Sequence, residues 1–356
     1  MRDRYLNYYY NGKHYTSQWL AWSAGVSDGL TLNESQNKTR ATLGYDTTSF
    51  DNYDWTVEPK ESWAEICKQR AQQIRDENDH VAISYGGGSD SHHILETFIK
   101  NNIKVDELVI NVDSLMHNDA YINCEQNAWA GETVRLMPSH VKITTITHNT
   151  LDSWKSQFNE DTILKRGGTL APNSLGVCQR IWQPPNNKSV LINGSWEPVI
   201  QKDSNGKFYI HLWDTDGFGT SFSVPGTIPF YTDPAFPAVH AKQCHIIKNF
   251  FKKNKNFLDY SKDYVYYKDT IIRLTRTAER LSLYKKSPFY VKINYEDKPH
   301  NHDWVQHPKA RAFYKNLSQN EPFEFARFHA TLSQKYLGIP LIRHKKGVEI
   351  GKYYLE

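Results

Sequence analysis

The chain has 356 residues, of which 39% are hydrophobic and 13% aromatic, so it is long enough to bury a sizeable core, and its composition excludes general disorder. The net charge of +4 hides an asymmetry, because residues 241–356 carry 23 Lys and Arg against 11 Asp and Glu, whereas residues 1–240 carry 20 against 28. No stretch approaches the roughly 18 apolar residues of a membrane span, the N-terminus lacks the apolar core of a signal peptide, and four scattered cysteines argue against a thiolate zinc site. We therefore expect a cytoplasmic globular protein.

The N-terminal segment, residues 1–58, is rich in Tyr, Thr, Asn and Asp and shows no sustained periodicity. We interpret it as an irregular cap. The pair Asn11-Gly12 predicts a tight hairpin turn within it, because both residues readily adopt the left-handed backbone conformation that such turns need.

An α/β domain is predicted over residues 59–240. Apolar residues fall on one helical face from Trp63 to Ile74, and short apolar runs then indicate strands at 81–85, 107–112, 141–146 and 189–193. The segments between these strands are long enough to hold crossover helices, so we expect a parallel, Rossmann-like sheet with helices on both faces.

The rest of the chain changes in character. Residues 201–240 are rich in Gly, Pro and Asp, which favours a hairpin followed by an ordered loop region. Residues 241–356 contain several basic amphipathic segments, so we expect a basic, mainly helical C-terminal lobe.

A glycine-rich junction follows the first predicted strand. In the stretch VAISYGGGSDSHH, residues 81–93, an apolar run ends in three glycines and a Ser-Asp-Ser triplet, and apolar residues then recur at helical spacing. Glycines let backbone approach a ligand closely, and the start of a helix offers free N–H groups to an anion. The junction therefore predicts a phosphate-binding loop.

Several interpretations of this loop compete. A Walker loop needs Gly-Lys-Ser/Thr at the start of the helix, and the sequence Asp-Ser-His found there fits it poorly. The dinucleotide fingerprint fits loosely through Gly86, Gly88 and Ser91, with Asp113 at the end of the next strand, and stays open on spacing. A carboxylate at Asp90 repels a pyrophosphate unless magnesium lies between them. The simplest alternative is that Asp90 only caps the helix.

The loop resembles that of the PP-loop ATP pyrophosphatases, the superfamily of asparagine synthetase, GMP synthetase and the lysidine and thiouridine tRNA-modifying enzymes. Their loop reads Ser-Gly-Gly-x-Asp-Ser after the first strand, and the residues that match are Gly87, Gly88, Ser89, Asp90 and Ser91. Gly86 stands in place of the family's first serine, so Ser84 or Tyr85 is the candidate for the missing hydroxyl. The resemblance covers about residues 60–200.

A second point of resemblance lies at the end of the fourth predicted strand. In the asparagine synthetase branch, a later strand runs into a Gly- and acid-rich turn that helps to hold magnesium pyrophosphate. Here the stretch SVLINGSWEPVI places Asn193, Gly194 and Glu197 at that point, in a turn that is shorter and has one acidic position fewer. The resemblance makes Glu197 the candidate for a second magnesium-binding carboxylate.

The resemblance implies ATP and Mg²⁺ as ligands. The backbone of the glycine loop, together with the hydroxyl of Ser91, would hold the β- and γ-phosphates, Asp90 and Glu197 would bind magnesium, and Asp113 would contact adenine or ribose. An acceptor oxygen would then displace pyrophosphate from the α-phosphorus to form an adenylate, and an amine or ammonia would displace AMP. No protein nucleophile is required.

The nature of the acceptor stays open. Arg2 stands where a glutaminase domain has its nucleophilic cysteine, and 58 residues are too few for that domain, so we expect an asparagine synthetase-like enzyme that ligates ammonia or an amine to a small molecule. A tRNA or other nucleic acid is the first alternative, and a degenerate nucleotide sensor or scaffold without turnover is the second. The candidate nucleic-acid contacts are Lys252, Lys253, Lys255, Arg273, Arg276 and Arg280.

Overall fold

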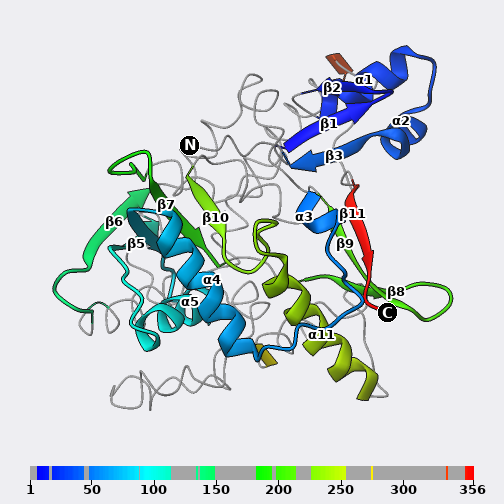
Figure 1. Cartoon of the computed structure of the whole chain (residues 1–356). Helices are drawn as coiled ribbons and strands as arrows, with labels where there is room; N and C mark the ends of the chain where they lie inside the picture. The colour runs from blue at the N-terminus through cyan, green and yellow to red at the C-terminus, as the bar shows by residue number, and fades with distance from the viewer. Residues whose placement is uncertain are drawn as a thin grey trace, which may run out of the picture.

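The computed structural model describes residues 6–15, 18–43, 48–87, 89–113, 134, 137–148, 182–194, 198–213, 226–253, 274–275, 334–335 and 349–356. Figure 1 shows a central sheet behind two helices, a second small sheet beside it and a third small sheet, drawn in blue, at the upper right. No helix within these ranges is long and apolar enough to cross a membrane.

The central sheet has five strands in the order β10-β7-β4-β5-β6, and all of its pairings are parallel. The strands are β4 (His80–Ser84), β5 (Glu107–Asp113), β6 (Lys142–His148), β7 (Ser189–Asn193) and β10 (Thr227–Pro229). The first four confirm the predicted strands to within two residues at either end. The predicted parallel α/β sheet is therefore confirmed, and β10 is a fifth strand that we did not predict.

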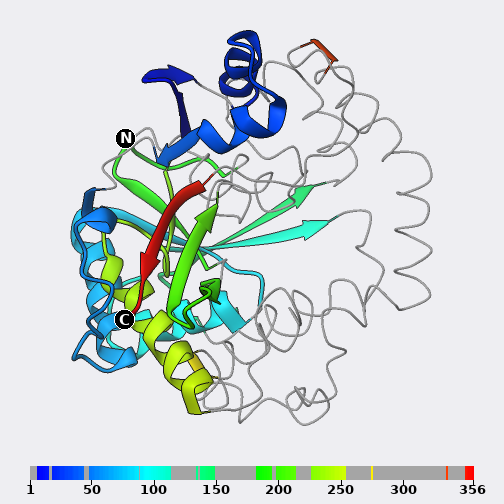
Figure 2. The same cartoon turned by 90° about the vertical axis from the view of Figure 1, so that its right-hand side faces the viewer.

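Two helices cover one face of this sheet, as both views show (Figures 1 and 2). Helix α4 (Trp63–Glu77) begins at a capping box, in which Ser62 and Glu65 each accept a hydrogen bond from the other's backbone N–H. Helix α5 (Ser89–Lys100) follows the glycine loop. Apolar side chains of α4, α5 and the strands form one buried cluster between helices and sheet.

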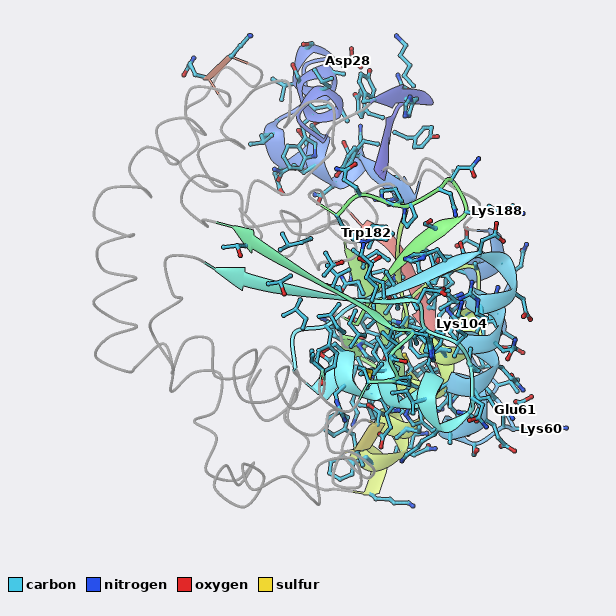
Figure 3. The ribbon with its side chains drawn as sticks, turned by 90° about the vertical axis from the view of Figure 1, so that its left-hand side faces the viewer. Asp28, Lys60, Glu61, Lys104, Trp182 and Lys188 are labelled. Atoms are coloured by element: carbon cyan, nitrogen blue, oxygen red, sulfur yellow. The ribbon has the colours of Figure 1, made fainter. Side chains whose placement is uncertain are left out.

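The opposite face of the sheet carries a smaller buried cluster, which includes Ala82, Val109, Leu191 and Trp182. Figure 3 shows Trp182 beside the strands. It also shows Lys104 and Lys188 at the edge where the strands begin, opposite to the edge toward which β5 and β6 point. The segments that should supply crossover helices, residues 114–133 and 151–181, lie outside the described residues.

The N-terminal segment is not irregular, which corrects our prediction. Three antiparallel strands, β1 (Leu6–Tyr10), β2 (Lys13–Tyr15) and β3 (Arg40–Leu43), pack with helices α1 (Gln18–Ser27) and α2 (Leu32–Lys38), and a short helix α3 (Thr48–Asp51) follows. The predicted hairpin is confirmed, because Tyr10 pairs with Lys13 and both intervening residues have positive φ angles.

A second small sheet joins distant parts of the chain in the order β11-β9-β8. Its strands β8 (Ile200–Lys202) and β9 (Phe208–Trp213) form the hairpin predicted after residue 200. The third strand, β11 (Glu349–Tyr354), lies in the lobe expected to be mainly helical, and it is a strand that we did not predict there. The sheet packs against helix α11 (Pro237–Lys253).

One apolar cluster spans these parts. It contains Trp22 of α1, Ile210 of β9, Ile247 of α11 and Leu355, so the N-terminal segment shares a core with residues 200–251 and with the C-terminal strand. The predicted boundary at residue 240 falls inside α11.

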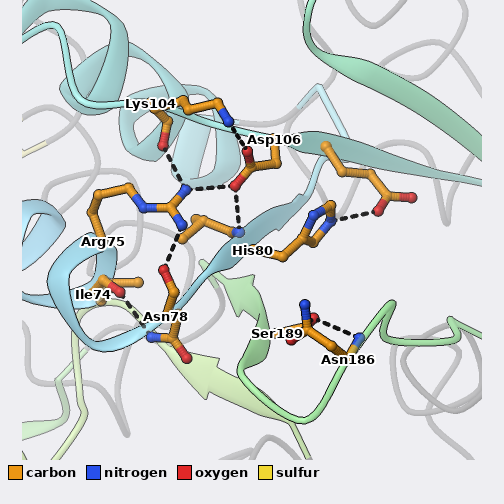
Figure 4. A network of polar contacts seen from close by, with 10 residues as sticks. Ile74, Arg75, Asn78, His80, Lys104, Asp106, Asn186 and Ser189 are labelled. Atoms are coloured by element: carbon orange, nitrogen blue, oxygen red, sulfur yellow. Dashed lines mark hydrogen bonds and ion pairs between the residues drawn. The ribbon is translucent and has the colours of Figure 1, made fainter.

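Polar side chains fasten α4 to the edge of the sheet at which the strands begin (Figure 4). Arg75 donates to Asp106, which also pairs with Lys104 at 2.7 Å and accepts from the Val81 N–H. Burial raises the pKa of Asp106, but these hydrogen bonds and the positive charges outweigh it and lower the pKa to about 2. This network lies at the opposite edge from the glycine loop.

Candidate functional site

The order of the central strands creates a switch point beside β4. From β4 the chain adds β5 and β6 on one side, whereas β7 and β10 lie on the other side. In open parallel sheets, ligands bind in the crevice outside the carboxyl ends of the strands where the order reverses. The segments that follow β4 and β7 meet at this point, and both were predicted to hold phosphate.

The glycine loop runs from the end of β4 into α5. Ser84 ends the strand and is 8% exposed, and Tyr85 continues the ladder through its N–H, which donates to the Val109 carbonyl at 2.8 Å. The N–H of Gly86 donates to Oγ of Ser91 at 3.3 Å, and Gly87 has a φ angle of +76°. The turn therefore needs glycine at residue 87, since L side chains strain this conformation.

Gly194, at the end of β7, lies directly against the first turn of α5. A Cβ atom at Gly194 would stand 3.1 Å from the carbonyl carbon of Asp90, 3.1 Å from the backbone nitrogen of Ser91 and 2.9 Å from Cδ1 of Ile94. The structure thus brings together Asp90, Ser91 and Gly194, which the sequence places in two separate motifs. The close approach is possible because residue 194 has no side chain.

The other predicted site residues are described only in part. Asp113 is the last residue of β5, and its backbone pairs with that of His148. It lies four residues beyond Val109, which pairs with Ser84 of β4. The side chain of Asp113 is not described. Ser89 begins α5, again without a described side chain. Gly88 and Glu197 lie outside the described residues, so the predicted second magnesium carboxylate stays a prediction.

Two pairs of a tyrosine and a histidine lie at this site, and of these four residues the sequence indicated only Tyr85 as a candidate contact. The buried hydroxyl of Tyr85 contacts Nδ1 of His92 at 2.9 Å. The hydroxyl of Tyr231, which follows β10, contacts Nδ1 of His93 at 2.8 Å and donates to the carbonyl oxygen of Asp90 at 3.1 Å. Tyr231 is separated from Asp90 by 141 residues, so no local pattern could have identified it.

The backbone at the start of α5 favours an anion, and the carboxylate of Asp90 favours a cation. The N-terminal end of the 12-residue helix α5 carries a partial positive charge and N–H groups without partners inside the helix. Asp90 opposes that charge, and Oδ1 of its carboxylate is buried. A hard carboxylate oxygen is the type of ligand that magnesium prefers. Within the described ranges, no group of three or more His, Cys, Asp or Glu residues could hold a metal ion.

The basic residues considered for nucleic acid are described for one helix end only. Lys252 and Lys253 end α11, and Lys252 forms an ion pair with Glu356. The remaining four lie outside the described residues.

Substituting Gly194 tests the close approach of β7 to α5. We expect Gly194→Ala to lower the free energy of unfolding by about 1–3 kcal/mol, because backbone atoms of Asp90 and Ser91 must move away from the new methyl group. Affinity for inorganic pyrophosphate should fall at least about tenfold, which corresponds to roughly 1.4 kcal/mol. Urea denaturation and calorimetric titration measure the two effects.

The matched control is Gly86→Ala. No atom of the described residues lies within 4 Å of a Cβ atom built at Gly86, and its φ angle is not positive. We expect the free energy of unfolding to change by no more than about 0.5 kcal/mol. Equal destabilisation by both substitutions would contradict the assigned contact.

Comparison with known proteins adds no assignment to this site. The chain matches no family model, no curated protein and no solved structure, so the site rests on its own residues and their geometry.

Proposed function

We propose that the chain is an ATP pyrophosphatase that binds magnesium–ATP where β4 meets α5, transfers AMP to an acceptor and releases pyrophosphate. The proposed acceptor is a carboxylate or amide oxygen of a small molecule, and ammonia or an amine then takes the place of AMP. The observation that supports the proposal is the convergence of Asp90, Ser91 and Gly194 at the switch point of a parallel sheet.

The loop's own groups would bind the β- and γ-phosphates. Backbone N–H groups at the start of α5 point away from the helix body, and Gly87 gives the loop the tight turn that exposes them. Oγ of Ser91 accepts from the Gly86 N–H, which places this hydroxyl beside the backbone of the glycine loop. The absence of a side chain at Gly194 keeps β7 close to these donors.

The reaction then needs position and charge rather than a protein nucleophile. An acceptor carboxylate oxygen attacks the α-phosphorus, the bond to the β-phosphate oxygen breaks, and pyrophosphate leaves with the bonding electrons. An amine attacks the resulting acyl adenylate, AMP leaves, and the nitrogen loses a proton. Asp90 would hold magnesium, which supplies positive charge opposite the leaving pyrophosphate when it is bound.

Gly86 favours a second candidate function, in which the chain binds nucleotide without turnover. The PP-loop enzymes that the loop resembles have a serine at this position, and here its hydroxyl is missing. The described residues leave room for a side chain, so steric crowding does not explain the glycine. A loop with one phosphate contact fewer would still bind ATP, but it would hold the transition state less well.

Product analysis separates these functions. ATP labelled at the α-phosphate is incubated with the protein and magnesium, alone and with an amino-acid and ammonia pool or with bulk tRNA, and labelled AMP and ADP are resolved. We expect AMP, equimolar with pyrophosphate, with the amino-acid pool only. AMP with tRNA only would indicate a nucleic-acid acceptor, and ATP binding without AMP in any pool would favour the nucleotide sensor. Formation of ADP, or no binding of ATP, would contradict the proposal.

A further inference from the structure

The hydroxyl of Tyr231 reaches a single peptide group at the start of α5. It donates to the carbonyl oxygen of Asp90 at 3.1 Å, and this carbonyl belongs to the same planar peptide group as the N–H of Ser91. Gly194 packs against the carbon and nitrogen atoms of that peptide group. One peptide plane is therefore held by residues that follow two different strands, β7 and β10.

The hydrogen bonds of Tyr231 fix the tautomer of His93. A phenol has one proton, and a carbonyl oxygen can only accept, so the proton of Tyr231 lies toward Asp90. Nδ1 of His93, 2.8 Å from the phenol oxygen, must then be the donor of the second hydrogen bond. We therefore assign the proton of His93 to Nδ1. Loss of the hydrogen bond to Tyr231 would change the nitrogen-15 NMR signals of the His93 ring.

The surroundings of Tyr231 keep its ring in place. The side chain is fully buried, and its ring stacks with Trp63 of α4 at a centroid distance of 6.1 Å and with His93 at 5.9 Å. On the side of β10, the Phe230 N–H donates to the Asn193 carbonyl at 2.9 Å, which ties this segment to the residue before Gly194. A rotation of the phenol is thus opposed by packing on both sides.

We infer that Tyr231 is a positioning residue for phosphate at this site. By holding the Asp90 carbonyl, it sets the direction of the Ser91 N–H at the other end of the same peptide plane. A hydrogen bond to the carbonyl also polarises the peptide group and makes its N–H a stronger donor. The phosphate role rests on the proposed function, whereas the contact with Asp90 is independent of it, and the tautomer of His93 is inferred from that contact.

Tyr231→Phe tests this inference, because it removes the hydroxyl and keeps the ring. We expect affinity for ATP and for inorganic pyrophosphate to fall about 5- to 30-fold, which corresponds to the loss of one hydrogen bond of about 1–2 kcal/mol. KM for ATP should rise with kcat changed less. Nitrogen-15 NMR of labelled histidine should show Nδ1 of His93 protonated in the wild type and this signal altered in the variant.

The control is Tyr353→Phe on the C-terminal strand β11. It removes a hydroxyl that donates to Oδ1 of Asp51 at 2.8 Å. It should leave both affinities and the His93 signal unchanged. Thermal unfolding of both variants confirms that the fold is kept.

The possible results separate the two hypotheses. Weaker pyrophosphate binding in Tyr231→Phe, in a wild type that forms no AMP, would keep Tyr231 as a phosphate-positioning residue and refute adenylation. Equal affinities in wild type and variant, or a wild-type His93 protonated on Nε2 alone, would overturn the inference about Tyr231 whatever the reaction is.

Discussion

Asp90→Asn is expected to lower the rate of AMP formation by a factor of about 10² to 10³, the range seen when one preorganised electrostatic contact to a transition state is removed. The substitution keeps the size of the side chain and removes its negative charge. The amide binds magnesium less well than a carboxylate, so charge on the leaving pyrophosphate would be poorly balanced. Steady-state kinetics with ATP labelled at the α-phosphate measures the effect.

The fold should survive this substitution. Asp90 is the second residue of α5, so the loss is that of the attraction between a carboxylate and the helix N-terminus, about 0.3–1 kcal/mol. The control is Asp76→Asn, which neutralises an exposed carboxylate on α4 that accepts from Gln72, and it should leave the rate unchanged. If Asp90→Asn forms AMP at the wild-type rate, Asp90 serves only the first turn of the helix and the magnesium role fails.

The second large effect concerns stability. Asp233→Ala should lower the free energy of unfolding by about 3–5 kcal/mol, because it leaves a buried guanidinium without its counter-charge. Arg70 and Asp233 have side chains 2% and 1% exposed, and their Nη2 and Oδ2 atoms are 2.6 Å apart. The pair joins α4 to the segment after β10 that carries Tyr231. Urea denaturation at pH 7 measures the loss.

Two further variants show whether the missing charge is the cause. Arg70→Met combined with Asp233→Leu replaces both charges with apolar groups, and it should be more stable than Asp233→Ala alone, since no unpaired charge stays buried. Lys104→Ala removes a 62% exposed partner of Asp106 and should change stability by less than about 1 kcal/mol. Equal losses in Asp233→Ala and Lys104→Ala would refute the assigned role of the buried pair.

The strand, loop and helix around residues 80–100 could be predicted because their signals are local. Three glycines between an apolar run and a helical pattern determine β4, the turn at Gly87 and α5, whatever the rest of the chain does. The position of Gly194 beside Asp90 was implied only by a family resemblance. This position depends on the pairing of β7 with β4, two strands that are far apart in the sequence, so no local pattern determines it.

The elements that were missed lack a local pattern. Helix α1, with the sequence QWLAWSAGVS, has apolar residues on several sides, so no helical stripe appears, and Trp22 within it is fully buried. Strand β10 has three residues in a stretch rich in Gly and Pro, too short for alternation to show. The contact of Tyr231 with Asp90 could not be predicted from the sequence, because it depends on the pairing of β10 with β7.

The pairing of β11 with β9 has a consequence for synthesis on the ribosome. Phe208 exchanges backbone and side-chain hydrogen bonds with Leu355 and Glu356, up to 148 residues later in the chain. At about 5 to 20 residues per second, β9 waits roughly 7 to 30 s for this partner, with one edge of backbone N–H and C=O groups unpaired by β11. The strands β4 to β7 can pair before that time. The nascent chain is therefore most exposed to wrong strand pairing after strands β4 to β7 have formed and before residues 349–356 emerge.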